Sequence, residues 1–167
     1  PINAAKVGCS DVNEEVLQKL SQRVKFMDVT KINEGLHYLR DKRRARKNNV
    51  VLIADDDPLI RSLIDAGLSP HASVYESKDG SDAVSLYLEY LPDIVFLDIH
   101  MPGKSGIDIL REIIRYDPDA HCIMLSADAV KDKVVGTHQI GSKGFIVKPF
   151  SRQKFEAAYM KAPTVRK

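Results

Sequence analysis

The run VVLIADDDP, residues 50–58, decides how we expect this chain to fold. Its first five residues are apolar and three of them are β-branched, which is typical of a strand buried on both faces of a parallel sheet. Three carboxylates follow at once. Asp57 stands before Pro58, so it is placed to cap a helix that begins with the proline. The run therefore predicts a strand, an acidic turn and a helix.

The same alternation continues toward the C-terminal part of the sequence. Further short, largely apolar runs lie at 72–75, 94–97, 122–125 and 145–147. Helix-like stretches lie at about 58–67, 81–90, 106–116, 129–139 and 151–161, and Ser105 is placed to cap the third. Five strands that alternate with five helices predict an α/β domain with a doubly wound parallel sheet, covered by helices on both faces.

The first 49 residues differ from the rest in charge and in pattern. They hold 11 Lys or Arg and 6 Asp or Glu, whereas residues 50–167 hold 14 and 17. Apolar residues recur at helical spacing before and after an expected break at residues 28–30, which predicts two short helices that end in a basic run. We therefore divide the chain into a helical, hairpin-like extension (1–48), an α/β domain (49–161) and a tail (162–167).

Polar side chains follow the predicted strands. The first strand ends in Asp55 and Asp56, the third in Asp98, the fourth in Ser126, and the fifth in Lys148. Because functional groups of parallel α/β sheets gather at the carboxyl ends of the strands, we expect these groups to converge. Crowded carboxylates suit Mg²⁺, and a carboxylate beside a metal, a hydroxyl and an ammonium can accept a phosphoryl group. The pattern predicts phosphoryl transfer to an aspartate.

Four stretches resemble the receiver domain of two-component response regulators. They are VVLIADDDP (50–58), FLDIHMPG (96–103), LSA (125–127) and GFIVKPF (144–150), in the order and near the spacing of that family. The resemblance covers about residues 49–161. It implies a flavodoxin-like, chemotaxis-type receiver fold with strand order 2-1-3-4-5.

The resemblance also implies roles at the acidic cluster. Asp98 would be the phosphoacceptor. Asp55 and Asp56 would bind Mg²⁺ together with Asp98, and Mn²⁺ can substitute. A backbone carbonyl, that of Ile99 or more often that of His100, would complete the protein ligands.

Further residues correspond to the switch of the family. Ser126 would be the hydroxyl that closes on the phosphoryl group, and Lys148 would pair with the phosphoryl oxygens. Phe145 would be the aromatic side chain that turns inward once Ser126 has moved. Signalling would then use the face of the fourth helix, fifth strand and fifth helix, at about 129–161.

The expected function is that of a response regulator in a phosphorelay, phosphorylated by a histidine kinase or a phosphotransfer protein. Its chemistry would be at most self-phosphorylation from a phosphodonor and autodephosphorylation, so it is not a conventional enzyme. One alternative is a receiver-like interaction module that acts without phosphorylation. A phosphatase with an aspartyl nucleophile fits less well, because that class needs a second Asp where this chain has His100.

Output is expected through a downstream protein, because the last predicted helix ends close to the end of the sequence. The amino-terminal helices would pack on the α/β domain or pair between subunits, so a homodimer could form there or through the 129–161 face. We interpret the basic run at 42–47 as a solvated helix end and not as a nucleic-acid contact. Nor do 49 residues suffice for His37 to serve a four-helix phosphotransfer domain.

Location follows from what the sequence lacks. No apolar run is long enough for a membrane span, and no start resembles a signal peptide. The two cysteines, Cys9 and Cys122, do not form a disulfide framework. We therefore expect a cytoplasmic protein without membrane association.

Overall fold

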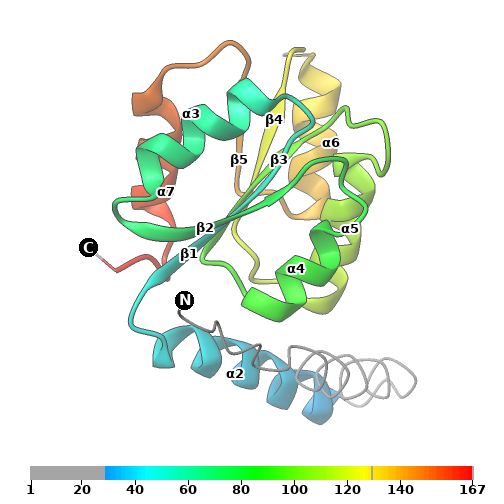
Figure 1. The fold of residues 1–167 in the computed structure, drawn as a ribbon. Helices are drawn as coiled ribbons and strands as arrows, with labels where there is room; N and C mark the ends of the chain where they lie inside the picture. Colours follow the sequence, from blue (N-terminus) through cyan, green and yellow to red (C-terminus); the bar gives the residue numbers. More distant parts are fainter. Residues whose placement is uncertain (1–28, 129, 167) are drawn as a thin grey trace.

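The computed structural model describes residues 29–128 and 130–166, which form one helix followed by alternating strands and helices (Figure 1). In chain order the elements are α2 (Val29–Ala45), β1 (Asn49–Ala54), α3 (Pro58–Leu68), β2 (Ala72–Ser77), α4 (Ala83–Tyr90), β3 (Ile94–Asp98), α5 (Gly106–Tyr116), β4 (Cys122–Ser126), α6 (Lys131–Ile140), β5 (Gly144–Val147) and α7 (Arg152–Lys161).

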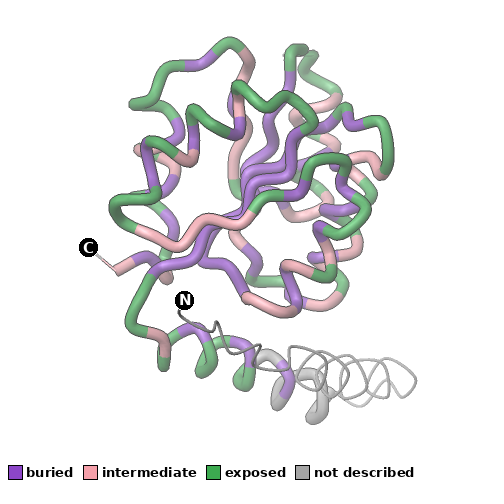
Figure 2. Tube along the Cα trace, viewed as in Figure 1, coloured by how far each residue is buried: buried purple, intermediate pink, exposed green. Residues whose placement is uncertain are grey.

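The five strands form one parallel sheet in the order β2-β1-β3-β4-β5. This confirms the doubly wound α/β fold and the strand order that the resemblance implies. The central strands β1, β3 and β4 are buried along their whole length, while β2 and β5 form the edges (Figure 2).

Alternate residues of each strand point into two separate apolar cores. Val51 and Ile53 of β1 pack in a cluster that includes residues of α3 and α7. Leu52 and Ala54 pack in the opposite cluster, with residues of α4 and α5. Helices therefore cover both faces of the sheet (Figure 1), which is why the central strands read as continuous apolar runs.

Both predicted helix caps are present. Asp57 accepts a hydrogen bond from the Leu59 N–H at 2.8 Å, and Ser105 accepts one from the Ile107 N–H at 3.3 Å. These caps place the first turns of α3 and α5 directly after the carboxyl ends of β1 and β3.

Helix α2 begins at Val29, within the predicted break, and packs against the α/β domain beside α4 and the start of β1 (Figure 1). Leu39 is 1% exposed in this contact. The second expected amino-terminal helix therefore packs on the α/β domain of its own chain, which is one of the two arrangements expected. The first expected helix lies outside the described residues.

The interpretation of residues 42–47 as a solvated helix end is wrong for two arginines. Arg43 is 3% exposed, and its guanidinium donates to Asp117 Oδ2, to the Tyr87 hydroxyl and to the carbonyls of Leu91 and Pro92. Arg46 forms an ion pair with the buried Asp93 at 3.0 Å. These acidic partners lie far along the chain, so no local pattern reveals them.

The residues after α7 also pack on the domain. Ala162 and Val165 are buried in the apolar cluster beneath α3 and α7. Arg166 donates to Asn49 Oδ1 and to the carbonyl of Arg43, so it touches both β1 and α2. Among the helices of the described ranges, none is long and apolar enough to cross a membrane.

Candidate functional site

The predicted site residues meet at the carboxyl edge of the sheet. Asp98 ends β3 and Ser126 ends β4, while Asp55 follows β1 and Lys148 follows β5. Since these strands are parallel and three of them are central, their carboxyl ends bring groups from distant parts of the chain to one place.

Lys148 joins two of the carboxylates. Its Nζ lies 2.7 Å from Asp55 Oδ2 and 2.7 Å from Asp98 Oδ1. Asp55 is fully buried and Asp98 is 3% exposed, so the pairs are poorly screened by water. Burial lowers the pKa of Lys148, but the contacts with Asp55 and Asp98 outweigh it, and the pKa lies above its usual value. Lys148 therefore stays protonated and offers a fixed positive charge.

One of the two carboxylate oxygens of Asp55 can accept a further partner. Its Oδ1 accepts the Asp57 N–H at 3.0 Å, whereas its buried Oδ2 makes no well-directed hydrogen bond and has only the charge contact with Lys148. Burial raises the pKa of Asp55, and the Lys148 ammonium offsets this only in part. An additional cation at Oδ2 would supply the compensation that this buried oxygen lacks.

The loop after β3 holds Asp98 by backbone contacts. Asp98 Oδ2 accepts the His100 N–H at 2.8 Å, and the Ile99 N–H donates to the Leu125 carbonyl at 3.0 Å. Gly106 closes the loop against the strand, because a Cβ built on it would lie 1.9 Å from the Asp98 carbonyl oxygen. A residue without a side chain at the start of α5 is therefore part of how Asp98 is positioned.

Asp55, Asp56 and Asp98 form a cluster that could hold a metal ion. One carboxylate oxygen from each lies within 4.8 Å of the others. Asp56 is exposed, which keeps the cluster open to water on one side. Hard oxygen donors with an open side match the needs of Mg²⁺, which keeps several waters when bound to protein. The three carboxylates, with an Asp55 oxygen whose burial Lys148 offsets only in part, thus fit this ion.

Ser126 is buried beside the cluster, where its Oγ accepts the Asp128 N–H at 3.1 Å. Phe145 pairs in register with Met124 and is half-buried against the core that includes α4 and α5. The two predicted switch residues, Ser126 and Phe145, therefore lie on the neighbouring strands β4 and β5.

The sequence did not single out Lys133. Its Nζ lies 3.2 Å from His100 Nε2 and 3.2 Å from Asp128 Oδ2, so α6 contacts the loops that follow β3 and β4. A partly exposed lysine in the first turn of a helix carries no local signal of such a role. Only the approach of α6 to these loops reveals it.

Comparison with known proteins agrees with this geometry. The family described as response regulator receiver domain matches residues 51–160. The chemotaxis protein CheY of Bacillus subtilis is 40% identical over 106 residues, covering 62% of this chain and 88% of its own. The CheY of Listeria monocytogenes is 40% identical over 114 residues, covering 67% and 96%.

A solved structure shares the fold as well. The crystal structure of the CheX-CheY-BeF3-Mg²⁺ complex from Borrelia burgdorferi contains a chain that matches with a TM-score of 0.62 and 35% identity, over 67% of this chain and 87% of that one.

Proposed function

The chain belongs to the response regulator receiver family, and from this premise we propose that Asp98 accepts a phosphoryl group from a histidine kinase or a phosphotransfer protein. The observation that carries the proposal is the position of Lys148, at 2.7 Å from both Asp55 and Asp98. A protonated lysine between two buried carboxylates is suited to receive the oxygens of an incoming phosphoryl group.

The step begins with attack of an Asp98 carboxylate oxygen on phosphorus. An oxygen–phosphorus bond forms, the bond from phosphorus to the donor histidine nitrogen breaks, and the imidazole leaves with the electron pair. Lys148 would then contact the phosphoryl oxygens. The His100 N–H would hold the Asp98 carboxylate in place through its present hydrogen bond to Oδ2.

Asp55 and Asp56 would hold Mg²⁺ together with Asp98, and the ion would neutralise the charge of the phosphoryl group. For the backbone ligand, the arrangement favours the carbonyl of His100 over that of Ile99. The Ile99 carbonyl already accepts the Gly106 N–H at 3.2 Å.

Signalling would follow from a movement of Ser126 toward the phosphoryl group. Its Oγ would give up the hydrogen bond from the Asp128 N–H, and Phe145 would turn further into the core beside it. The changed surface would be that of α6, β5 and α7, within residues 129–161, and a downstream protein would bind there. We expect this signalling to take place in the cytoplasm, where histidine kinases are phosphorylated from ATP.

The arrangement also separates the proposal from an aspartyl phosphatase of the haloacid-dehalogenase type. In that class the nucleophile follows the first strand and is followed two residues later by a second Asp. Here Asp98 ends β3 and His100 stands at the second position.

The proposal is tested by intact-protein mass after incubation with Mg²⁺ and acetyl phosphate, for wild type and Asp98→Asn. We expect a gain of one phosphoryl group in wild type that disappears in the variant and with a chelator. If wild type gains no mass and beryllofluoride with Mg²⁺ does not bind, the phosphorylation-independent interaction module becomes the better account.

A homodimer that depends on phosphorylation is a separate proposal. Gel filtration with and without beryllofluoride and Mg²⁺ would show it as an increase in apparent mass. An unchanged monomer under both conditions would refute it.

A further inference from the structure

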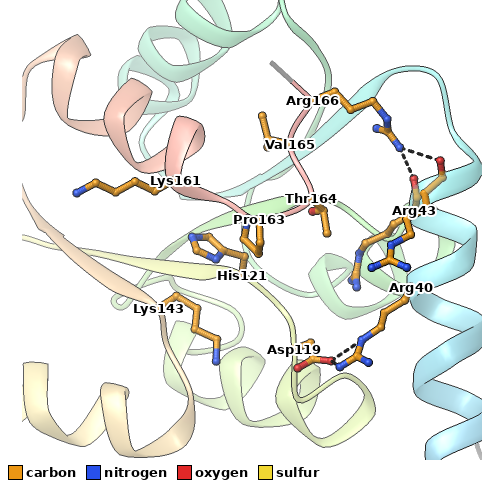
Figure 3. A pocket seen from close by; sticks show the side chains of 11 residues that line it. Arg40, Arg43, Asp119, His121, Lys143, Lys161, Pro163, Thr164, Val165 and Arg166 are labelled. Carbon is orange, nitrogen blue, oxygen red and sulfur yellow. Dashed lines mark hydrogen bonds and ion pairs between the residues drawn. The ribbon is translucent and has the colours of Figure 1, made fainter.

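A basic cavity lies at the amino ends of the strands, on the opposite side of the domain from the acidic cluster at their carboxyl ends. Its volume is about 730 Å³, within the range of small-molecule sites, which is about 300–1,000 Å³. Three parts of the chain form it: α2, the residues just before β4 and β5, and the segment after α7 (Figure 3). His121 and Lys143 precede the two strands, so they stand at the amino ends of the sheet.

Positive charge dominates this lining. Six of its residues are Lys or Arg and only one is a carboxylate, Asp119. The cations are Arg40, Arg43, Arg44, Lys143, Lys161 and Arg166.

Two of these charges are already balanced. Arg43 is paired with the buried Asp117, and Arg40 is paired with Asp119 on the rim. Within residues 29–128 and 130–166, Arg44 and Lys143 have no acidic partner, and Arg166 donates only to neutral oxygens, those of Asn49, Arg43 and Arg44. An excess of positive charge therefore remains inside a concave site, where the surrounding protein concentrates its field.

His121 lies in the cavity and responds to this field. Burial lowers the pKa of its imidazole, and the Lys143 ammonium lowers it further. Figure 3 shows the two side chains on the same side of the hollow, across from Arg40 and Arg166.

We propose that this cavity binds a small anion with two or more phosphate groups, held chiefly by Arg44 and Lys143. Guanidinium and ammonium groups are the preferred protein partners of phosphate oxygens, and several such groups around one cavity favour a ligand with several charges. The lining contains no Phe, Tyr or Trp among its described residues, so it lacks the stacking platforms with which proteins bind single-stranded nucleic acid.

This binding site is independent of phosphorylation at Asp98, because it uses other residues, at the amino ends of the strands. A ligand here would contact α2 and the receiver domain together. It would therefore hold α2 on the domain.

Calorimetric titration of the full chain with inorganic tripolyphosphate tests the proposal, with EDTA present to keep metal from the acidic cluster. The test variant is Arg44→Gln/Lys143→Gln. Neither substitution should disturb the fold, because Arg44 and Lys143 are both exposed. The hydrogen bond from Lys143 to the Cys122 carbonyl comes from its backbone N–H, which glutamine keeps. The matched control is Arg115→Gln/Lys131→Gln, which removes two exposed positive charges outside the cavity.

We expect binding to wild type and to the control, and at least about tenfold weaker binding to the test variant. In wild type, tripolyphosphate should also raise the pKa of His121, as followed by NMR. Absence of binding to wild type, or equal weakening in both variants, would overturn the proposal. Tighter binding of a single-stranded oligonucleotide through Arg44 and Lys143 would overturn it in favour of a nucleic-acid site.

Discussion

Arg43 Nη2 lies 2.6 Å from Asp117 Oδ2, and the two side chains are 4% and 2% exposed. The pair joins α2 to the loop after α5, and the Tyr87 hydroxyl completes it with bonds of 2.5 Å to Arg43 and 2.7 Å to Asp117. Buried charges are tolerated only when paired and hydrogen-bonded, which holds for each member of this group. The helix before the receiver domain is therefore attached to it by a specific polar contact.

Replacement of Arg43 by Ala should destabilise the protein by about 3–5 kcal/mol, because Asp117 would remain buried without its partner. Arg40→Ala is the matched control. It removes an ion pair from the same helix whose partners are about half exposed, so it should cost at most about 1 kcal/mol. Urea unfolding of the three proteins measures both values. Equal losses would mean that the buried pair does not hold α2 on the domain.

The substitution Gly106→Ala tests how the loop after β3 is held, and Gly136→Ala in α6 serves as its control. Gly106→Ala places a methyl group against the Asp98 carbonyl oxygen, so we expect a loss of at least about 2 kcal/mol of stability and slower phosphorylation. Gly136→Ala in α6 meets no atom within 4 Å, and it should stabilise the protein by about 0.5–1 kcal/mol. Thermal unfolding and mass-detected phosphorylation give the comparison. A Gly106→Ala protein that matches wild type in both would refute the positioning role.

Asp55 should make the stability of the metal-free protein depend on pH. Its pKa is raised in the folded state by burial, so the folded state binds the proton more tightly than the unfolded state does. Its contribution to stability is present at acid pH and is lost as pH rises from the unfolded value of 3.8 through the folded pKa. Asp55→Asn should therefore unfold at a higher temperature than wild type at neutral pH without metal.

Added Mg²⁺ should reverse that order. At a hundred times its dissociation constant, the ion would stabilise wild type by about 2.7 kcal/mol and the variant much less. Thermal unfolding with and without Mg²⁺ measures this. Equal stabilisation of both proteins would show that Asp55 is not a ligand.

His121 should give the opposite pH dependence. Its folded-state pKa lies below the ordinary value of 6.5, because burial and Lys143 oppose protonation. Wild type should then lose stability relative to His121→Asn as pH falls below about 6.5, where the unfolded chain takes up the proton first. Lys143→Gln should make this loss smaller. Urea unfolding across the pH range tests it, and a difference that does not vary with pH would contradict the assignment.

The strands, their carboxyl-terminal side chains and two helix caps were open to prediction from the sequence. A buried parallel strand must be an apolar run, and Asp98, Ser126 and Lys148 follow such runs directly. Asp57 and Ser105 cap helices by bonds to backbone groups two residues away. Each of these features depends on neighbours in the chain, so the local pattern carries it.

Other features depend on residues that the chain brings together from afar. Arg43 was expected in solvent, yet its acidic partner is 74 positions away. Lys133 lies 33 positions from His100, and the basic cavity combines α2, two strand starts and the last residues of the described chain.

The sequence by itself thus determined the receiver fold and placed the side chains of the proposed site at the carboxyl ends of the strands, where the structure brings them together. The tertiary structure alone decided which charges of α2 are buried and which remain free to bind an anion. The reason is physical: burial periodicity and capping act over a few residues, whereas the pairing of a buried charge depends on which distant carboxylate the packed helices place beside it.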